Sequence, residues 1–419
     1  MKIKSVEAIE VLDSRGKPTI STSVKLEDGS AGRSFVPSGA STGQLEAYEL
    51  RDCDDKRYFG QGVKQAVRNV NEIIAPELLA KNIFDQIEID KLMIDLDNTK
   101  NKSNLGANSI LSVSMAASKA AANSSNLELY EYLRVVFEKI LGKKINFSIP
   151  KPMLNIFNGG AHANNKIDIQ EFMIVPNEKL PYSDGLRLSA EVYQNLKAVL
   201  KNKGYSTAVG DEGGFASDLS SNEEVLTIIA QSLERIGLQV GSDISLALDC
   251  AASEFFRQEK YELKGIGKSL SSRQMIEYLA SLCKKFNVSS VEDPFSESDW
   301  KAWSEFTREM TNLQIVGDDL FVTQKKLLAK GIKEKSANSI LIKLNQVGTL
   351  TETLETIALS KNNNFSTIIS HRSGETEDSF ISDLAVAVNA DFIKSGAPAR
   401  SDRTAKYNRL LIIENQLYP

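Results

Sequence analysis

The first 140 residues show a strand period of hydrophobic and polar positions, followed by a helix period. Alternating positions predict strands over residues 3–12 and 18–26, and a turn at 27–30 leads into a third strand through Val36. Apolar residues then recur three and four positions apart, which predicts helices over residues 62–79, 84–96, 107–123 and 127–139. Strands followed by helices indicate an α+β domain over residues 1–140.

From about residue 150 the pattern changes to short, almost continuous apolar runs between amphipathic helical stretches. Such runs are typical of parallel strands covered on both faces. Six runs stand out, and they end at Asp249, Glu292, Asp318, Lys343, His371 and Lys394. The last five of these ends follow at intervals of 26, 25, 28 and 23 residues, which favours a (β/α)8 barrel over residues 141–419. A doubly wound sheet is the alternative, because spacing does not distinguish the two.

The residues that end these runs are candidates for one shared site, because the carboxyl-terminal ends of barrel strands open on one face. Asp249, Glu292 and Asp318 are carboxylates that would repel one another without a cation. Oxygen ligands of this kind suit Mg²⁺ or Mn²⁺ better than zinc. A lysine beside such a cation, Lys343 or Lys394, can act as a general base because its pKa is lowered. The alternative is a buried network of lysines and carboxylates that stabilises the barrel mouth.

Both histidines lie in polar loops of the second half of the chain. His162 lies in a glycine-rich loop, and His371 is followed directly by Arg372 and Ser373. A guanidinium and a hydroxyl next to an accessible backbone N–H suit a phosphate or a carboxylate. The alternative for Ser373 is a helix N-cap.

The segment Gly210–Phe215 places Asp211 and Glu212 among three glycines. Glycines let the backbone approach a ligand, and the acids could bind a metal or supply a general acid. A tight turn is the alternative. The sequence Gly267-Lys268-Ser269 resembles the end of a phosphate-binding loop, but Glu262 stands where that motif requires glycine. We therefore predict a surface loop there.

Composition and charge exclude several function classes. The 419 residues carry 50 basic and 55 acidic side chains, a net charge of −5, which argues against nucleic acid or an anionic membrane as a partner. No apolar run approaches the roughly 18 residues of a membrane span, and the first residues lack the apolar stretch of a signal peptide. Three widely spaced cysteines suit free thiols in a reducing compartment. We expect a cytoplasmic protein, with a cell-surface or leaderless secreted pool as the alternative.

Beyond these patterns, the chain resembles the enolase family from end to end. The segments that carry the resemblance are Asp13–Thr19, Val36–Gly43, Asn101–Asn108, Gln170–Ile174, Gly210–Phe215, Val291–Pro294, Gly317–Thr323, Ser370–Asp378 and Ala405–Asn408. Their joint order and spacing make the resemblance specific. It implies an N-terminal α+β cap domain with a mobile loop at Ser38–Gly43, followed by an enolase-type (β/α)8 barrel whose first elements depart from simple alternation.

The resemblance also implies an activity, the reversible Mg²⁺-dependent dehydration of 2-phosphoglycerate to phosphoenolpyruvate in glycolysis. It makes Lys343 the base that removes the C2 proton and Glu212 the acid that protonates the departing C3 hydroxyl. It implies two Mg²⁺ ions, the first held by Asp249, Glu292 and Asp318, and the second bound with the help of Ser41 on the closing loop. It adds His162 and Glu171 to the catalytic residues, and Gln170, His371, Arg372, Ser373 and Lys394 to the substrate-binding ones.

The implied acid and base need opposite protonation states at one pH. Burial would raise the pKa of Glu212 and keep it protonated, whereas neighbouring cations would lower the pKa of Lys343 and keep it neutral. Both pKa shifts are expectations, because they depend on which charges lie next to Glu212 and Lys343 in the folded protein.

The sequence departs from the family pattern at a few positions outside these functional residues. Lys17 and Ser21 lie in the N-terminal hairpin, which contributes to the family's dimer contact, and Asn164 stands where an acid is common. Ser217 replaces a common proline and is expected to loosen the loop after Gly210–Phe215. We expect a homodimer or an octamer built from dimers. The rival functions are dehydration of an acid sugar by the same superfamily, and a non-catalytic role as a surface binder or a partner in RNA degradation.

Overall fold

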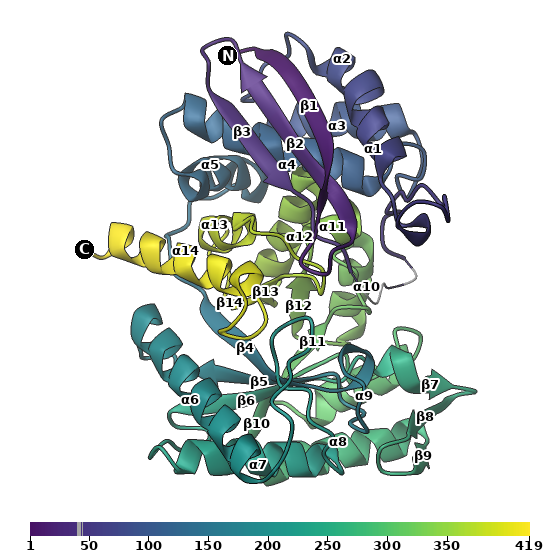
Figure 1. The fold of residues 1–419 in the computed structure, drawn as a ribbon, viewed down its shortest axis with the longest axis vertical. Helices are drawn as coiled ribbons and strands as arrows, with labels where there is room; N and C mark the ends of the chain where they lie inside the picture. The colour runs from purple at the N-terminus through teal and green to yellow at the C-terminus, as the bar shows by residue number, and fades with distance from the viewer. Residues whose placement is uncertain (40–42, 44) are drawn as a thin grey trace.

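The computed structural model describes residues 1–39, 43 and 45–419, so the central residues 40–42 of the predicted mobile loop at Ser38–Gly43 lie outside the described residues. A small β-rich domain at the N-terminus is followed by a closed eight-stranded barrel with its helices (Figure 1). The two parts meet at the carboxyl-terminal ends of the barrel strands, where Ser38 pairs with Gly374 in an isolated β-bridge. The predicted α+β cap followed by a β/α barrel is confirmed, and the closed barrel rules out the doubly wound alternative.

The N-terminal domain consists of an antiparallel sheet of three strands covered by helices. Its elements are β1 (Ile3–Leu12), β2 (Pro18–Leu26), β3 (Ala31–Phe35), α1 (Lys64–Arg68), α2 (Ala75–Leu78), α3 (Gln86–Asp97), α4 (Ala107–Ser124) and α5 (Leu129–Leu141). The small side chains of α4 let it pack closely against β3. A Cβ atom at Gly32 would lie 2.3 Å from the carbonyl oxygen of Ala116, so this approach requires glycine.

The predicted helix over residues 62–79 is interrupted in the structure. A π-helical segment, Asn69–Ile74, lies between α1 and α2. Pro76 follows it and has no N–H to donate, which is a common reason for a departure from regular α-helix. The other three predicted helices of this domain correspond to α3, α4 and α5.

The barrel strands run in the order β4, β5, β6, β10, β11, β12, β13 and β14, and β14 closes on β4. Their bounds are β4 (Lys151–Asn158), β5 (Glu171–Pro176), β6 (Ile244–Asp249), β10 (Val288–Glu292), β11 (Gln314–Gly317), β12 (Ser339–Ile342), β13 (Ser366–Ser370) and β14 (Phe392–Lys394). Strand β5 is antiparallel to both of its neighbours, whereas the remaining pairs are parallel. The departure from simple alternation therefore lies at the second barrel strand.

The helices of the second domain surround the barrel. They are α6 (Tyr182–Asn202), α7 (Asn222–Glu234), α8 (Ser272–Phe286), α9 (Trp300–Glu309), α10 (Lys325–Glu334), α11 (Leu344–Val347), α12 (Leu350–Asn362), α13 (Phe380–Ala387) and α14 (Ser401–Leu417). A small sheet of β7 (Phe256–Arg257), β8 (Lys260–Leu263) and β9 (Lys268–Leu270) projects from it. The predicted surface loop at Gly267–Ser269 was therefore wrong in part, because Lys268 and Ser269 belong to an exposed strand. No described helix combines the length and apolar character that a bilayer span requires.

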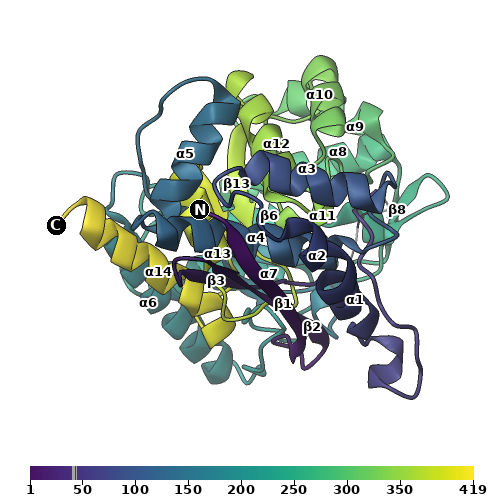
Figure 2. The same ribbon diagram turned by 90° about the horizontal axis from the view of Figure 1, so that it is seen from above.

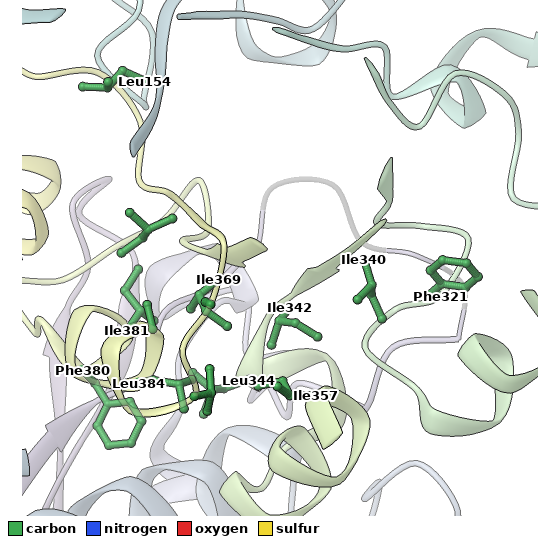
Figure 3. Packing of buried hydrophobic residues seen from close by; sticks show 14 of the residues in the cluster. Leu154, Phe321, Ile340, Ile342, Leu344, Ile357, Ile369, Phe380, Ile381 and Leu384 are labelled. Atoms are coloured by element: carbon green, nitrogen blue, oxygen red, sulfur yellow. The ribbon is translucent and has the colours of Figure 1, made fainter. Parts of the chain in front are cut away.

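Alternate residues of the barrel strands face two separate apolar clusters. Ile340 and Ile342 of β12 and Ile369 of β13 belong to the large cluster shared with the surrounding helices, and Figure 3 shows Ile340 beside Phe321 and Ile342 above Leu344. The residues of the other parity form a second cluster, here called the apolar layer, made of Met153, Met173, Val175, Ala247, Val316, Leu341 and Ile368. Because successive strand side chains point to opposite faces, this layer fills the barrel interior.

The view from above shows elements of the cap lying over the barrel (Figure 2), and side-chain contacts join the two domains. Asp90 of α3 accepts hydrogen bonds from the backbone N–H and the hydroxyl of Thr351, at 2.9 and 2.6 Å, in the first turn of α12. Lys119 of α4 forms an ion pair with Asp378 at 2.7 Å. These contacts fix the edge of the cap beside the loops that follow β12 and β13.

Candidate active site

The functional side chains enter the barrel because they share the parity of the apolar layer. Asp249, Asp318 and Lys343 each stand two residues beyond a member of that layer, namely Ala247, Val316 and Leu341. Glu171 stands two residues before Met173, because β5 runs in the opposite direction. Lys394 follows Phe392, which packs against the same layer. These side chains, with Glu292 at the end of β10, are called the charged layer below.

Lys394 is the centre of the charged layer. Its Nζ atom lies 2.9 Å from Glu292, 3.0 Å from Asp249 and 3.2 Å from Glu171, and the lysine is 2% exposed. Burial lowers the pKa of Lys394, but the three carboxylates outweigh it and raise the pKa well above its usual range. Lys394 is therefore a fixed positive charge.

Lys343 lies on the opposite side of this group and pairs with Asp318. Gln346 donates to the same carboxylate at 2.9 Å and accepts from Thr323 at 2.6 Å. The Thr323 hydroxyl in turn accepts from the Lys343 backbone N–H at 2.9 Å, so the position of Lys343 is set from both ends.

The protonation state of Lys343 differs from the sequence-based expectation. Burial lowers the pKa of this lysine, but the charge of Asp318 outweighs burial and raises the pKa. The expectation considered neighbouring cations and did not consider a carboxylate in direct contact. With the charges of the protein alone, Lys343 is protonated at neutral pH.

Glu212 faces Lys343 and Lys394 across the same space. Asn155 of β4 donates to its Oε2 atom at 2.9 Å, and His162 Nδ1 lies 3.6 Å from that oxygen. His371 Nε2 lies 3.7 Å from the other carboxylate oxygen. Two histidines and an amide therefore surround a carboxylate that is 2% exposed.

The expectation that Glu212 is protonated was also wrong for the protein alone. Burial raises its pKa, but nearby positive charges outweigh burial and lower the pKa. His162 has the largest lowering effect on the pKa of Glu212, followed by His371, Arg403 and Lys394. Burial holds the pKa of His371 well below its usual range, so Arg403 and Lys394 are the permanent charges near Glu212.

The glycines around Glu212 serve a contact within the protein. A Cβ atom at Gly214 would lie 2.4 Å from the Oδ1 atom of Asn158, and one at Gly210 would lie 2.9 Å from the carbonyl oxygen of His162. The segment is also a tight turn, with Gly213 N–H donating to the Gly210 carbonyl at 3.0 Å. The close backbone approach predicted for these glycines is therefore made to β4 and not to a ligand, and it brings Glu212 against that strand. The tight turn predicted as the alternative is also present.

Ser217 is held in place by hydrogen bonds. Its hydroxyl is fully buried and donates to the Ser206 carbonyl at 2.5 Å, and its carbonyl accepts from the Asn165 side chain at 3.1 Å. The hydroxyl makes a hydrogen bond that proline could not make, while the expected loosening of the loop stays a prediction.

Arg372 contacts the cap domain through Glu46. Its guanidinium donates to the two Glu46 carboxylate oxygens at 2.9 and 3.2 Å and to the Asn345 side chain at 2.9 Å. The Ser38 and Gly374 backbones exchange hydrogen bonds of 2.8 and 2.9 Å beside this pair. The cap domain thus forms part of the wall of the site.

The site is a small cavity of about 30 Å³, close to the volume of one water molecule. All the predicted site residues line it except Glu292, which contacts Lys394 beneath it, and Ser41, which lies outside the described residues. The structure thus brings together Glu212, Lys343, Glu171, His162, Gln170, His371, Arg372, Ser373, Lys394, Asp249 and Asp318.

Several residues at the site were not found from the sequence. Glu46, Asn155 and Arg403 contact Arg372, Glu212 and His371 respectively, from elements far away in the chain. No local pattern marks them. Asp293 and Asp319 stand directly beside predicted ligands, and their adjacency was a usable signal.

The donor set fits a hard divalent cation. Six carboxylates line the cavity, against the three cations Lys343, Arg372 and Lys394. Asp293, Asp318 and Asp319 place carboxylate oxygens within 4.8 Å of one another, and Glu292 Oε1 is buried without a hydrogen-bond partner among the described residues. Burial and the neighbouring Asp318 charge raise the pKa of Asp319 to about 8. Excess buried negative charge on oxygen ligands is what a divalent ion offsets.

A cap domain on a barrel whose mouth holds lysines, carboxylates and a divalent-cation donor set is compatible with a metal-dependent enzyme of the enolase superfamily, and the comparison with family models supports a lyase of that superfamily. The family model described as "Enolase, N-terminal domain" matches residues 3–133, and the one described as "Enolase, C-terminal TIM barrel domain" matches residues 146–418. The chain therefore belongs to the enolase family, whose members use divalent metal ions. The domain boundary near residue 140 stays a prediction.

Proposed function

We propose that this protein catalyses the reversible dehydration of 2-phosphoglycerate to phosphoenolpyruvate. The observation that carries the proposal is the placement of Lys343 and Glu212 on the lining of one small cavity, with Lys394 and Arg372 beside them. A base, an acid and two fixed cations around one space suit proton abstraction next to a carboxylate, followed by loss of a hydroxyl group.

The first half of the proposed reaction belongs to Lys343. Its Nζ atom takes the C2 proton, and the electron pair left on C2 moves into the substrate carboxylate. Lys343 must be neutral to do this, so its ion pair with Asp318 has to weaken when substrate and metal bind. A divalent cation on the carboxylates would take up the Asp318 charge and stabilise the negative charge that builds on the substrate carboxylate.

The second half belongs to Glu212. The C2–C3 double bond forms as the C3–O bond breaks, and the hydroxyl leaves as water with a proton from Glu212. Glu212 must carry that proton, although nearby cations lower its pKa in the free protein. A substrate with a phosphate and a carboxylate brings negative charge that offsets these cations and raises the pKa again.

The remaining residues bind and orient the substrate in this proposal. Arg372 and Ser373 follow one strand end and offer donors to the phosphate, while Lys394 offers a fixed charge to the carboxylate and His371 lines the cavity beside them. Gln170, His162 and Glu171 line the opposite wall.

Magnesium is the proposed metal because the candidate ligands are carboxylate oxygens. Asp249, Glu292 and Asp318 would hold the first ion, and Ser41 would help to bind the second with the substrate phosphate. Asp293 and Asp319 lie beside Asp318, with backbone N–H groups of Asp318 and Asp319 donating to Asp293 at 3.0 and 2.9 Å. The Asp293 carboxylate therefore orients the strand end that carries Asp318.

The test is a direct assay of the purified protein with 2-phosphoglycerate and Mg²⁺, following the ultraviolet absorbance of the enol double bond. The expected result is a rise in absorbance that EDTA abolishes and that Lys343→Met abolishes. The matched control is Lys325→Met, an exposed lysine paired with Glu355, which should keep full activity. A flat trace from folded, Mg²⁺-loaded protein would contradict the proposal.

Two further expectations accompany the proposal. The homodimer, or octamer of dimers, is tested by light scattering after size-exclusion chromatography. The cytoplasmic location is tested by fractionating the source cells, with a surface or secreted pool as the other outcome.

A further inference from the structure

Arg403 is a fully buried arginine of α14 that does not line the cavity but reaches two segments that do. Its Nη1 atom donates to His371 Nδ1 and, at 2.7 Å, to the Arg372 carbonyl. Its Nη2 atom donates to the Ser373 carbonyl at 2.7 Å and to the Asp211 carbonyl at 3.1 Å. One side chain thus ties the loop after β13 to the turn that carries Glu212.

The contact with His371 decides the position of the imidazole proton. A guanidinium has only donors, so the nitrogen that it contacts must be an acceptor. Nδ1 of His371 therefore carries no proton, and a neutral ring must carry its proton on Nε2. That nitrogen faces Glu212 Oε1 at 3.7 Å.

We propose that Arg403 is a positioning residue that fixes His371 in the Nε2–H tautomer and so keeps a donor directed at the Glu212 carboxylate. In the other tautomer, Nε2 would present a lone pair to the carboxylate oxygen, and the two would repel. The tautomer itself follows from the contacts of Arg403, whereas its effect on turnover rests on the proposed function.

The buried positive charge of Arg403 also has a carboxylate partner. Arg403 Nε lies 2.8 Å from the Asp402 carboxylate, which gives the buried charge a partner. The four acceptors on Nη1 and Nη2 are otherwise a ring nitrogen and three carbonyl oxygens. The planar guanidinium, with its several N–H donors, can contact all four acceptors, whereas a lysine ammonium would reach only some of them.

Nitrogen NMR tests the tautomer directly, because the chain has only two histidines, His162 and His371. The protein is labelled with ¹⁵N-histidine, and the two rings are assigned with His162→Asn and His371→Asn. We expect His371 to show an unprotonated Nδ1 and a protonated Nε2. A protonated Nδ1 in the wild-type protein would overturn the proposal, with or without enzymatic activity.

Variants test whether Arg403 is the cause. In Arg403→Met, the His371 signals should shift toward a mixture of tautomers, whereas those of His162 should stay in place. Arg403→Lys should restore part of the wild-type pattern. Arg409→Met is the matched control on the same helix, since Arg409 pairs with Asp383 and Glu128 and does not contact His371. An unchanged tautomer in folded Arg403→Met would overturn the proposal.

The kinetic readout should follow the spectroscopic one. We expect kcat to fall on the order of 10–100-fold in Arg403→Met, as for other residues that orient a functional side chain. Arg403→Lys should recover activity in proportion to the restored tautomer. If the protein does not dehydrate 2-phosphoglycerate, the proposed function fails while the tautomer result stands.

Discussion

The charged layer and the apolar layer lie on the same barrel strands, only two residues apart. Leu341 and Val316 are completely buried among apolar neighbours, whereas Lys343 and Asp318, two residues further along the strands, form an ion pair with side chains 15% and 10% exposed. Both layers are largely shielded from water, so the main difference between them is chemical.

This difference separates stability from function. Apolar side chains stabilise the fold when they leave water, by about 25 cal/mol per Å² of buried surface. In a buried ion pair the mutual attraction offsets the cost of desolvation, and the balance is close to zero. The apolar layer therefore holds the barrel together, and the charged layer is a costly arrangement that is explained by chemistry.

The largest expected effect comes from Lys343→Met in the charged layer. Removing a general base lowers turnover by about 10²–10⁴-fold. Steady-state kinetics with 2-phosphoglycerate measures it, and circular dichroism checks that the variant is folded. Turnover within tenfold of the wild type would remove Lys343 from the role of base.

Leu341→Ala in the apolar layer should act in the opposite way. Leu341 is fully buried, and the cavity left by its truncation should cost about 2–5 kcal/mol of unfolding free energy. Urea denaturation measures this loss. Turnover per folded molecule should change less than tenfold, and a larger fall would show that the two layers are coupled.

Magnesium should stabilise the protein through the charged layer. An ion present at 100 times its dissociation constant adds about 2.7 kcal/mol to the free energy of unfolding. Thermal unfolding with Mg²⁺ and with EDTA measures the shift, which Glu292→Gln should reduce. Leu341→Ala serves as the control that keeps the shift, and an identical shift in Glu292→Gln would exclude Glu292 as a ligand.

Asp90 is a buried carboxylate outside both layers, so it can be compared with the carboxylates of the charged layer. Burial raises its pKa to about 6, from a usual value of 3.8. The folded state therefore binds this proton more tightly than the unfolded state. The stabilisation is complete below pH 3.8 and is lost as the pH rises through about 6.

The predicted result is a wild-type protein that loses about 1.4 kcal/mol more than Asp90→Asn between pH 5 and pH 8. Urea denaturation of both proteins at several pH values gives this difference, in which the other titrating groups cancel. Parallel pH profiles for the two proteins would show that Asp90 does not titrate in this range.

Much of the fold follows from local patterns in the sequence. The apolar runs ending at Asp249, Glu292 and Lys394 are strands in the structure, and their alternation sends these side chains inward. The direction of β5 could not be predicted in this way, because its six residues are all buried and show no alternation. The direction of a strand in a barrel depends on how it pairs with the neighbouring strands, which the local sequence does not show.

The site was predicted less completely than the fold, because its electrostatics depend on long-range pairs. Arg372 meets Glu46, 326 residues away in the chain, and Arg403 meets His371 from a different element. The contact of Lys343 with Asp318 reverses the pKa shift expected for that lysine. Composition and motifs can identify the residues of the site, but the direction of each pKa shift depends on distances that only the structure gives.

The central claim is that the apolar layer stabilises the fold, whereas the charged layer serves chemistry. Its most direct test is the unfolding free energy of the double variant Lys343→Met/Asp318→Asn. The variant removes both charges of one ion pair, while the amide oxygen introduced at position 318 can still accept from Gln346. In EDTA-containing buffer we predict an unfolding free energy within about 1 kcal/mol of the wild type, or higher, together with complete loss of turnover. A loss of about 3 kcal/mol or more would contradict the division, because the charged layer would then hold the fold together.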